Sequence, residues 1–134
     1  AEAAKIKIGS ANSQKKDNKM EISGSNTISG LPESIIIHTN EIAAALKPVI
    51  NEIILSVKQV LQRTPPELSS DVMDKGVVIS GGGASLHDFD ELMTKVTGVP
   101  CQMVDEPALA TIKGIGLAVE NFDDFTQSLT WRGQ

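Results

Sequence analysis

The chain has 134 residues and a mass of 14.2 kDa, which is the size of one domain or of part of a larger one. Hydrophobic residues make up 40%, which argues against a disordered chain, and aromatic residues only 3%, which predicts an aliphatic core. The net charge of −5 argues against a nucleic-acid binder, and the single cysteine, Cys101, against a disulfide framework or a multi-cysteine zinc site.

The first third of the chain predicts a small β-rich region. Residues 1–4 are typical of the end of a helix, and the alternation of charged and apolar side chains over 5–9 predicts a half-exposed strand. Residues 10–19 are polar and aperiodic, so we expect a loop or a hairpin tip there. A short strand is predicted around 20–23, and three consecutive isoleucines within 34–38 indicate a buried strand.

A long amphipathic helix is predicted over 41–62, capped by Thr39 or Asn40. Steps of three and four separate its apolar side chains, which are Ile42, Leu46, Val49, Ile53, Val57 and Val60. Pro48 lies within this segment and is expected to kink or split the helix, because proline has no amide donor. A further helix, opened by two prolines, is predicted over 64–74.

The second half predicts alternating strands and helices. Residues 76–80 form a wholly apolar core strand that leads into three glycines at 81–83. An amphipathic helix over 88–97 should end at Gly98, which suits a helix C-cap, and a further strand is predicted over 99–104. This alternation indicates an α/β architecture.

The last predicted helix, over 107–120, carries Gly114 and Gly116 in its middle. Each glycine there lowers helix stability by about 1 kcal/mol relative to alanine. The usual reason for such glycines is close approach of another backbone, which we therefore expect. Residues 121–134 have scattered apolar side chains and no clear partner within the chain.

Gly81, Gly82 and Gly83 link the predicted strand to the helix that follows. Glycines at such a turn let backbone amides approach a phosphate or a sugar closely. Tight packing alone can also require them, and the pattern by itself favours neither interpretation. The turn is not a Walker loop, because no Gly-Lys-Ser/Thr follows, and it is not the dinucleotide fingerprint.

Two other groups of polar residues have a chemical and a structural interpretation. Ser85, His87 and Asp88 are the residue types of a hydrolase triad, but neighbours in sequence cannot adopt its geometry, so we expect His87 to face solvent. Glu2 and Lys5 are three residues apart and would share one helix face. They form either a local ion pair or a pair of polar arms that reach ribose hydroxyls.

Residues 64–84 resemble a hallmark run of the MreB family of bacterial actins. The matching letters are Thr-Pro-Pro-Glu-Leu and, later, Gly-Val-Val-Ile-Ser-Gly-Gly-Gly-Ala. The match continues over 2–11, which is similar to the start of the family's small β subdomain, and over 29–32. Residues 106–107 and 114–120 resemble the family's final helix. The resemblance therefore covers nearly the whole chain, in order.

This resemblance implies an α/β fold class: a fragment of the second domain of an actin-like ATPase, ribonuclease H-like, with a small β-rich outer subdomain. Residues 1–62 would form the outer subdomain, and residues 63–120 the inner subdomain with the glycine-turn adenosine motif. Residues 121–134 would be a tail that crosses toward the first domain. We therefore expect the chain to be a piece of a longer protein.

The resemblance also implies nucleotide-binding positions. Gly81, Gly82 and Gly83 would lie against the adenosine and its first phosphate. Glu2 and Lys5 match helix positions that contact ribose and adenine in this superfamily. The glycines of the last helix match a hinge helix that packs closely against its counterpart from the other domain.

The function implied is that of a cytoplasmic, filament-forming ATPase at the inner face of the cell membrane, which determines cell shape by organising peptidoglycan synthesis. The parent would bind ATP or ADP with Mg²⁺, and its partners would be other filament subunits and a membrane-anchored cell-shape adaptor. The family's phosphate-binding hairpins and metal-organising carboxylates have no match here. We therefore expect no catalytic or metal residue, no tight nucleotide binding and no hydrolysis from this chain alone.

Two alternatives remain open at this level. The chain could be a standalone protein-interaction module of actin-like fold without nucleotide chemistry. It could also be a half domain of a sugar kinase or of a chaperone-like ATPase. Within the matched region, Ser85 stands where family members usually have an aliphatic residue, and Lys113 precedes the first hinge glycine.

Overall fold

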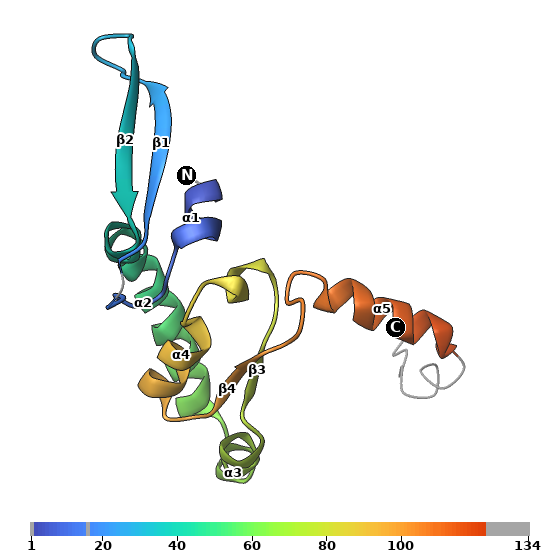
Figure 1. Ribbon diagram of the computed structural model, residues 1–134. Helices are drawn as coiled ribbons and strands as arrows, with labels where there is room; N and C mark the ends of the chain where they lie inside the picture. The colour runs from blue at the N-terminus through green and yellow to red at the C-terminus, as the bar shows by residue number, and fades with distance from the viewer. Residues whose placement is uncertain (1, 16, 123–134) are drawn as a thin grey trace, which may run out of the picture.

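The computed structural model describes residues 2–15 and 17–122, and Figure 1 shows how their helices and strands are arranged. A long central helix, α2, carries a β-hairpin at one end, and a last helix, α5, projects away on one side. The elements are α1 (Glu2–Ile8), β1 (Lys19–Ser25), β2 (Pro32–His38), α2 (Thr39–Arg63), α3 (Pro66–Lys75), β3 (Val77–Ile79), the 3₁₀ turn η1 (Gly82–Ser85), α4 (Phe89–Thr97), β4 (Cys101–Met103) and α5 (Ala110–Glu120).

The first strands form an antiparallel hairpin in which Lys19 pairs with His38 and Ser25 with Pro32. Its tip is the segment 26–31, where the Asn26 side-chain oxygen accepts hydrogen bonds from two backbone amides, as in an Asx turn. The prediction of a hairpin tip within 10–19 is therefore wrong. The alternative prediction of a loop is confirmed for the described residues up to position 18, whereas Lys19 already belongs to β1.

The isoleucine-rich strand β2 is more exposed than its sequence predicted. Ile35 is 50% exposed and Ile36 56% exposed, so the expectation of a buried strand is wrong for the described residues. The reason is that a two-stranded sheet buries a face only where another element covers it. Within the described part of the chain, β1 and β2 are the only strands in this sheet.

Residues 5–8 belong to helix α1, so the predicted strand over 5–9 is wrong. Ala4 and Ile8 are four residues apart and both are buried, which is the spacing of a helix face. Ile6, which an alternating strand would place on the same face as Ile8, is 73% exposed. Four residues of alternation were too short a pattern to outweigh this helical spacing.

Helix α2 confirms the predicted long amphipathic helix and runs without interruption through Pro48. The expectation that Pro48 splits the helix is therefore wrong. Its capping residue is His38 rather than Thr39 or Asn40, and the Glu41 carboxylate accepts a hydrogen bond from the His38 amide at 2.8 Å. This bond satisfies one amide next to the helix start.

The core lies between α2 and α4. Its buried members are Ile50, Ile54, Phe89 and Met93. Half-buried hydrophobic side chains surround them, among them Leu46, Val57, Ile79, Leu86, Leu92, Val96 and Cys101. The core is thus mainly aliphatic, as the composition predicted, and Cys101 contributes to it without being fully buried.

Strands β3 and β4 pair in parallel, with Val77 opposite Cys101, and α4 lies in the connection between them. The predicted core strand over 76–80 is only partly buried, because Val78 is 69% exposed while its two neighbours are half-buried. Gly98 ends α4 in the left-handed conformation, with a φ of 75°, which confirms the predicted cap.

Helix α5 has no buried residue among those described. A Cβ placed on Gly114 or Gly116 would meet no atom within 4 Å, so the described residues supply no closely approaching backbone at these glycines. The division into 1–62 and 63–120 stays a prediction, and the predicted tail lies outside the described residues beyond 122. Over the described ranges, no helix has the length and apolar character that a bilayer span requires.

Candidate functional site

A cavity of about 320 Å³ lies where α1, α2 and the glycine turn meet. Lys5 of α1 and Gly83 of η1 both line it, although they are far apart in sequence. Most other lining side chains are apolar, namely Leu46, Val49, Ile50, Ile53, Ile79, Ala84, Leu86 and Phe89, and Ser80 adds a hydroxyl. A largely apolar cavity with a few convergent polar groups is the usual form of a small-molecule site.

The glycine side of this cavity is held by the turn after β3. Gly81 has a φ of 91°, which favours glycine, and its amide donates a 2.7 Å hydrogen bond to the Pro107 carbonyl. The next residues form η1, in which Ala84 is buried and anchors the turn. A Cβ on Gly83 would meet no atom within 4 Å, so the backbone there borders open space rather than packed side chains.

The α1 side of the cavity is presented by a helix of only 7 residues. Ala4 and Ile8 anchor it, and Lys5 is exposed at the cavity. Glu2 lines a neighbouring apolar cavity of about 370 Å³, to whose lining Lys5 and Leu46 also belong. The two predicted polar arms therefore lie at adjacent cavities rather than at opposite sides of the fold.

The predicted site residues are only partly brought together. Lys5 and Gly83 share one cavity, and Glu2 borders the next one. Gly81 and Gly82 lie in the same turn as Gly83 but are not among the lining residues. Among the described residues, no group of three or more metal-ligating side chains of the His, Cys, Asp and Glu type occurs.

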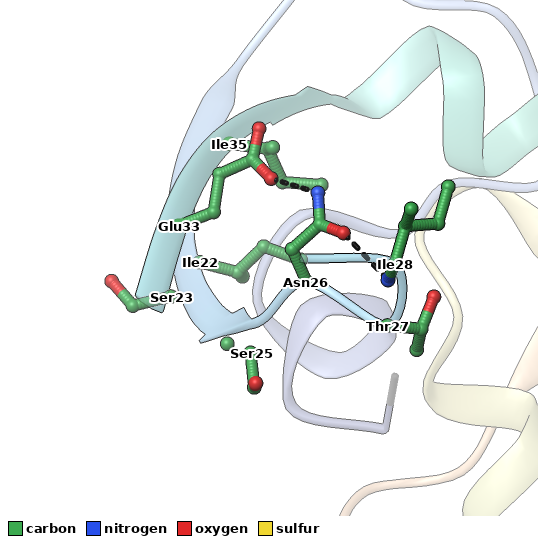
Figure 2. A pocket seen from close by; sticks show the side chains of 9 residues that line it. Ile22, Ser23, Ser25, Asn26, Thr27, Ile28, Glu33 and Ile35 are labelled. Atoms are coloured by element: carbon green, nitrogen blue, oxygen red, sulfur yellow. Dashed lines mark hydrogen bonds between the residues drawn. The ribbon is translucent and has the colours of Figure 1, made fainter. Parts of the chain in front are cut away.

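A further cavity, at the hairpin tip, is separate from these residues. It measures about 370 Å³ and is formed by the two strands and their turn alone. Figure 2 shows Asn26 at its centre, donating a hydrogen bond to Glu33 at 2.6 Å and accepting one from the Ile28 amide. This hollow contains none of the predicted site residues.

A polar network that the sequence did not predict lies next to the main cavity. The Asp88 carboxylate accepts hydrogen bonds from the Ser10 hydroxyl at 3.2 Å and from the Gln14 side-chain amide. His87 is exposed, as expected, and none of the hydrogen bonds found among the described residues links it to Ser85 as in a hydrolase triad. The one available signal was an Asp at the start of a predicted helix, which is ordinarily explained by capping.

Comparison with known proteins gives the family of this chain. The sequence model of the MreB/Mbl protein family matches residues 1–127. The chain belongs to the MreB/Mbl family. The resemblance found in the sequence is thereby confirmed.

Individual MreB and Mbl proteins are similar over most of the chain. The cell shape-determining protein Mbl of Bacillus cereus is 39% identical over 123 residues, which cover 92% of this chain and 37% of that protein. The cell shape-determining protein MreB of Escherichia coli is 36% identical over 123 residues, which cover 92% of this chain and 35% of that protein. This MreB/Mbl chain thus spans little more than a third of the length of the curated relatives that it matches.

Solved structures agree with the family. The crystal structure of MreB5 of Spiroplasma citri bound to ADP matches with a TM-score of 0.86 and 28% identity, over 94% of this chain and 38% of that one. The same protein bound to AMPPNP matches with a TM-score of 0.84. The fold of the chain is therefore that of a fragment of the MreB actin-like fold.

Proposed function

We propose that this chain forms one wall of an adenine-nucleotide site in a longer, filament-forming MreB/Mbl protein that determines cell shape. The observation that carries the proposal is the shared cavity of Lys5 and Gly83, which come from separate elements. Two further findings support it: the family of the chain, and two similar MreB5 structures that were solved with ADP and with AMPPNP.

In this proposal the apolar residues of the cavity hold the adenine base, because such a surface excludes water from a flat aromatic ring. Lys5 and Glu2 hydrogen-bond the ribose and the base from α1. The backbone of Gly81, Gly82 and Gly83 borders the adenosine and its first phosphate, where the lack of side chains allows a close approach. The described residues contain no group of three or more His, Cys, Asp and Glu side chains that could hold a metal ion, and the proposal assigns them no ligand for Mg²⁺.

The proposed role of the whole protein follows from its family. We infer that it assembles with copies of itself into filaments in the cytoplasm, at the inner face of the membrane, and organises cell-wall synthesis through a membrane-anchored adaptor. The exposed apolar side chains of α5 support a packing partner outside the described residues. Electron microscopy of the native protein with ATP tests assembly, and a failure to form filaments under any nucleotide condition would contradict it.

The nucleotide site is tested with the native protein that contains this chain, by titrating a fluorescent ADP analogue. We expect Lys5→Ala to weaken binding about tenfold, because a hydrogen bond to a charged group contributes about 1.5 kcal/mol. Lys7→Ala is the matched control, since Lys7 lies on the same short helix but does not line the cavity. Its affinity should equal that of the unsubstituted protein.

A second variant tests the glycine wall. Gly83→Val adds a branched side chain on the cavity side of the turn without an existing contact to disturb, so we expect it to reduce binding more than Lys5→Ala does. Gly24→Val adds the same side chain in the hairpin, where there is also open space. Equal affinity of the Gly83 and Gly24 variants would contradict the nucleotide site and favour a protein-interaction module.

A further inference from the structure

Asp88 occupies an unusual position for its residue type. It is the residue before α4, where an aspartate side chain ordinarily caps the helix, yet it makes no capping hydrogen bond. Its backbone is also left-handed, with a φ of 59° and a ψ of 19°, a conformation that few residues with a side chain adopt, although aspartate adopts it more readily than most. The unused cap leaves the carboxylate available for another contact.

That contact is with the segment that follows α1. The Asp88 carboxylate accepts hydrogen bonds from the Ser10 hydroxyl and from the Gln14 side-chain amide, which itself lies 2.9 Å from the Ser10 hydroxyl. Ser10 is only 1% exposed, while Gln14 and Asp88 are half-buried, so these bonds are partly shielded from water. We call Ser10, Gln14 and Asp88 the Asp88 clasp.

Backbone hydrogen bonds extend the clasp in two directions. The Ala11 amide donates to the His87 carbonyl at 2.8 Å, which joins the two chain segments directly. The Gln14 amide donates to the Asn40 side-chain oxygen at 2.8 Å, which ties the clasp to the start of α2. The clasp therefore fixes the end of α1 to both α2 and the segment after the glycine turn.

Two members of the clasp each follow a cavity-lining residue closely along the chain. Ser10 follows Lys5 by five residues, and Asp88 follows Gly83 by five residues. Helix α1 has 7 residues, of which Ala4 and Ile8 are buried, so the segment that follows it also helps to hold it in place. Movement of the segment after α1 would therefore change the separation between the lysine and the glycine backbone.

We propose that the Asp88 clasp is a positioning device that sets the spacing between Lys5 and Gly83 and so controls the affinity of the cavity for an adenine nucleotide. The inference rests on the proposed function for its ligand. Asp88 is a positioning residue here, since it does not line the cavity. The clasp adds nothing to binding by contact; it reduces the reorganisation that binding would otherwise require.

The decisive variant is Asp88→Gly in the native protein. Glycine adopts the left-handed conformation without strain, so this change removes the carboxylate while relieving the backbone. Hydrogen exchange by mass spectrometry reports the clasp itself through the Ala11 amide, and titration with a fluorescent ADP analogue reports the cavity. We expect faster exchange at Ala11, unchanged exchange in α4 around Met93, and about five- to tenfold weaker nucleotide binding.

Two further variants separate positioning from general stability. Asp88→Asn keeps an oxygen acceptor and tolerates the left-handed backbone, so it should restore most of the exchange protection and of the affinity. Gln14→Glu places a second carboxylate against Asp88 and should open the clasp by repulsion. Asp105→Gly removes an exposed carboxylate outside the clasp and should change neither measurement.

The outcomes are distinguishable. Faster Ala11 exchange together with weaker binding in Asp88→Gly, reversed in Asp88→Asn, supports the inference. Unchanged exchange, or faster exchange with unchanged affinity, overturns it while the nucleotide site itself stands. If the unsubstituted protein binds no adenine nucleotide, the proposed function fails and the inference falls with it.

Discussion

The backbone of Gly76 faces the carbonyl oxygen of Pro100 so closely that a Cβ on the glycine would lie 2.6 Å from that oxygen. The same oxygen accepts a 2.7 Å hydrogen bond from the amide of Val77, at the start of the β3–β4 pair. Gly76 also has a φ of 80°. Two separate reasons therefore require glycine at this position: the left-handed backbone conformation, and the Pro100 oxygen that an added Cβ would contact.

We predict that Gly76→Ala lowers the free energy of unfolding by about 2–4 kcal/mol, from left-handed strain together with overpacking against backbone. Urea unfolding followed by circular dichroism measures the change. Gly24→Ala is the matched control, since a Cβ there meets no atom within 4 Å and φ is not in the left-handed range. Equal midpoints for the two variants would show that the β3–β4 register adapts to the added methyl group.

Pro48 gives a prediction in the stabilising direction. It lies in the interior of the uninterrupted helix α2 and is exposed, so its ring contributes little packing while one helical hydrogen bond is missing. We predict that Pro48→Ala raises the free energy of unfolding by about 1–3 kcal/mol, because proline is disfavoured by about 3 kcal/mol in a helix interior. A lower urea midpoint for this variant would mean that the proline shapes α2 for a contact beyond the described residues.

Helix α5 leads to a prediction about association. None of its residues is buried, and its exposed hydrophobic side chains include Ile112, Ile115, Leu117 and Val119. A surface of this kind favours association, so we predict that the 134-residue chain self-associates in solution. The double substitution Ile112→Ser and Ile115→Ser should increase the monomer fraction in light scattering.

The control for this prediction is Val60→Ser, which removes an exposed apolar side chain from α2 instead. It should leave the association of the chain almost unchanged. A monomeric unsubstituted chain, or equal effects of the α5 and α2 substitutions, would show that α5 is not the associating surface.

The sequence predicted the long helix α2 and the helices and strands that follow it well, because each had a long or well-punctuated pattern. The stripe of apolar residues in α2 and the glycine cap at Gly98 are both present in the structure. Helix α1 was predicted at residues 1–4, but its continuation over 5–8 was missed, because the spacing of Ala4 and Ile8 covers one turn only and competes with a four-residue alternation. Local periodicity identifies an element only when it is repeated.

Burial and the polar network were not predictable from local pattern. The exposure of Ile35 and Ile36 depends on which elements cover the hairpin, a tertiary property that the run of isoleucines does not contain. The contact of Asp88 with Ser10 joins residues 78 positions apart. No pattern in either segment specifies the other, so the clasp became visible only in three dimensions.

That sequence separation has a consequence for the order in which the chain folds. The hairpin and the helices form from neighbouring residues, whereas joining α1 to the turn after β3 closes a loop of 78 residues at an entropic cost that local contacts do not share. We therefore predict that the cavity between Lys5 and Gly83 is completed late in folding. The site would then stay incomplete until α1 and the turn after β3 come into contact.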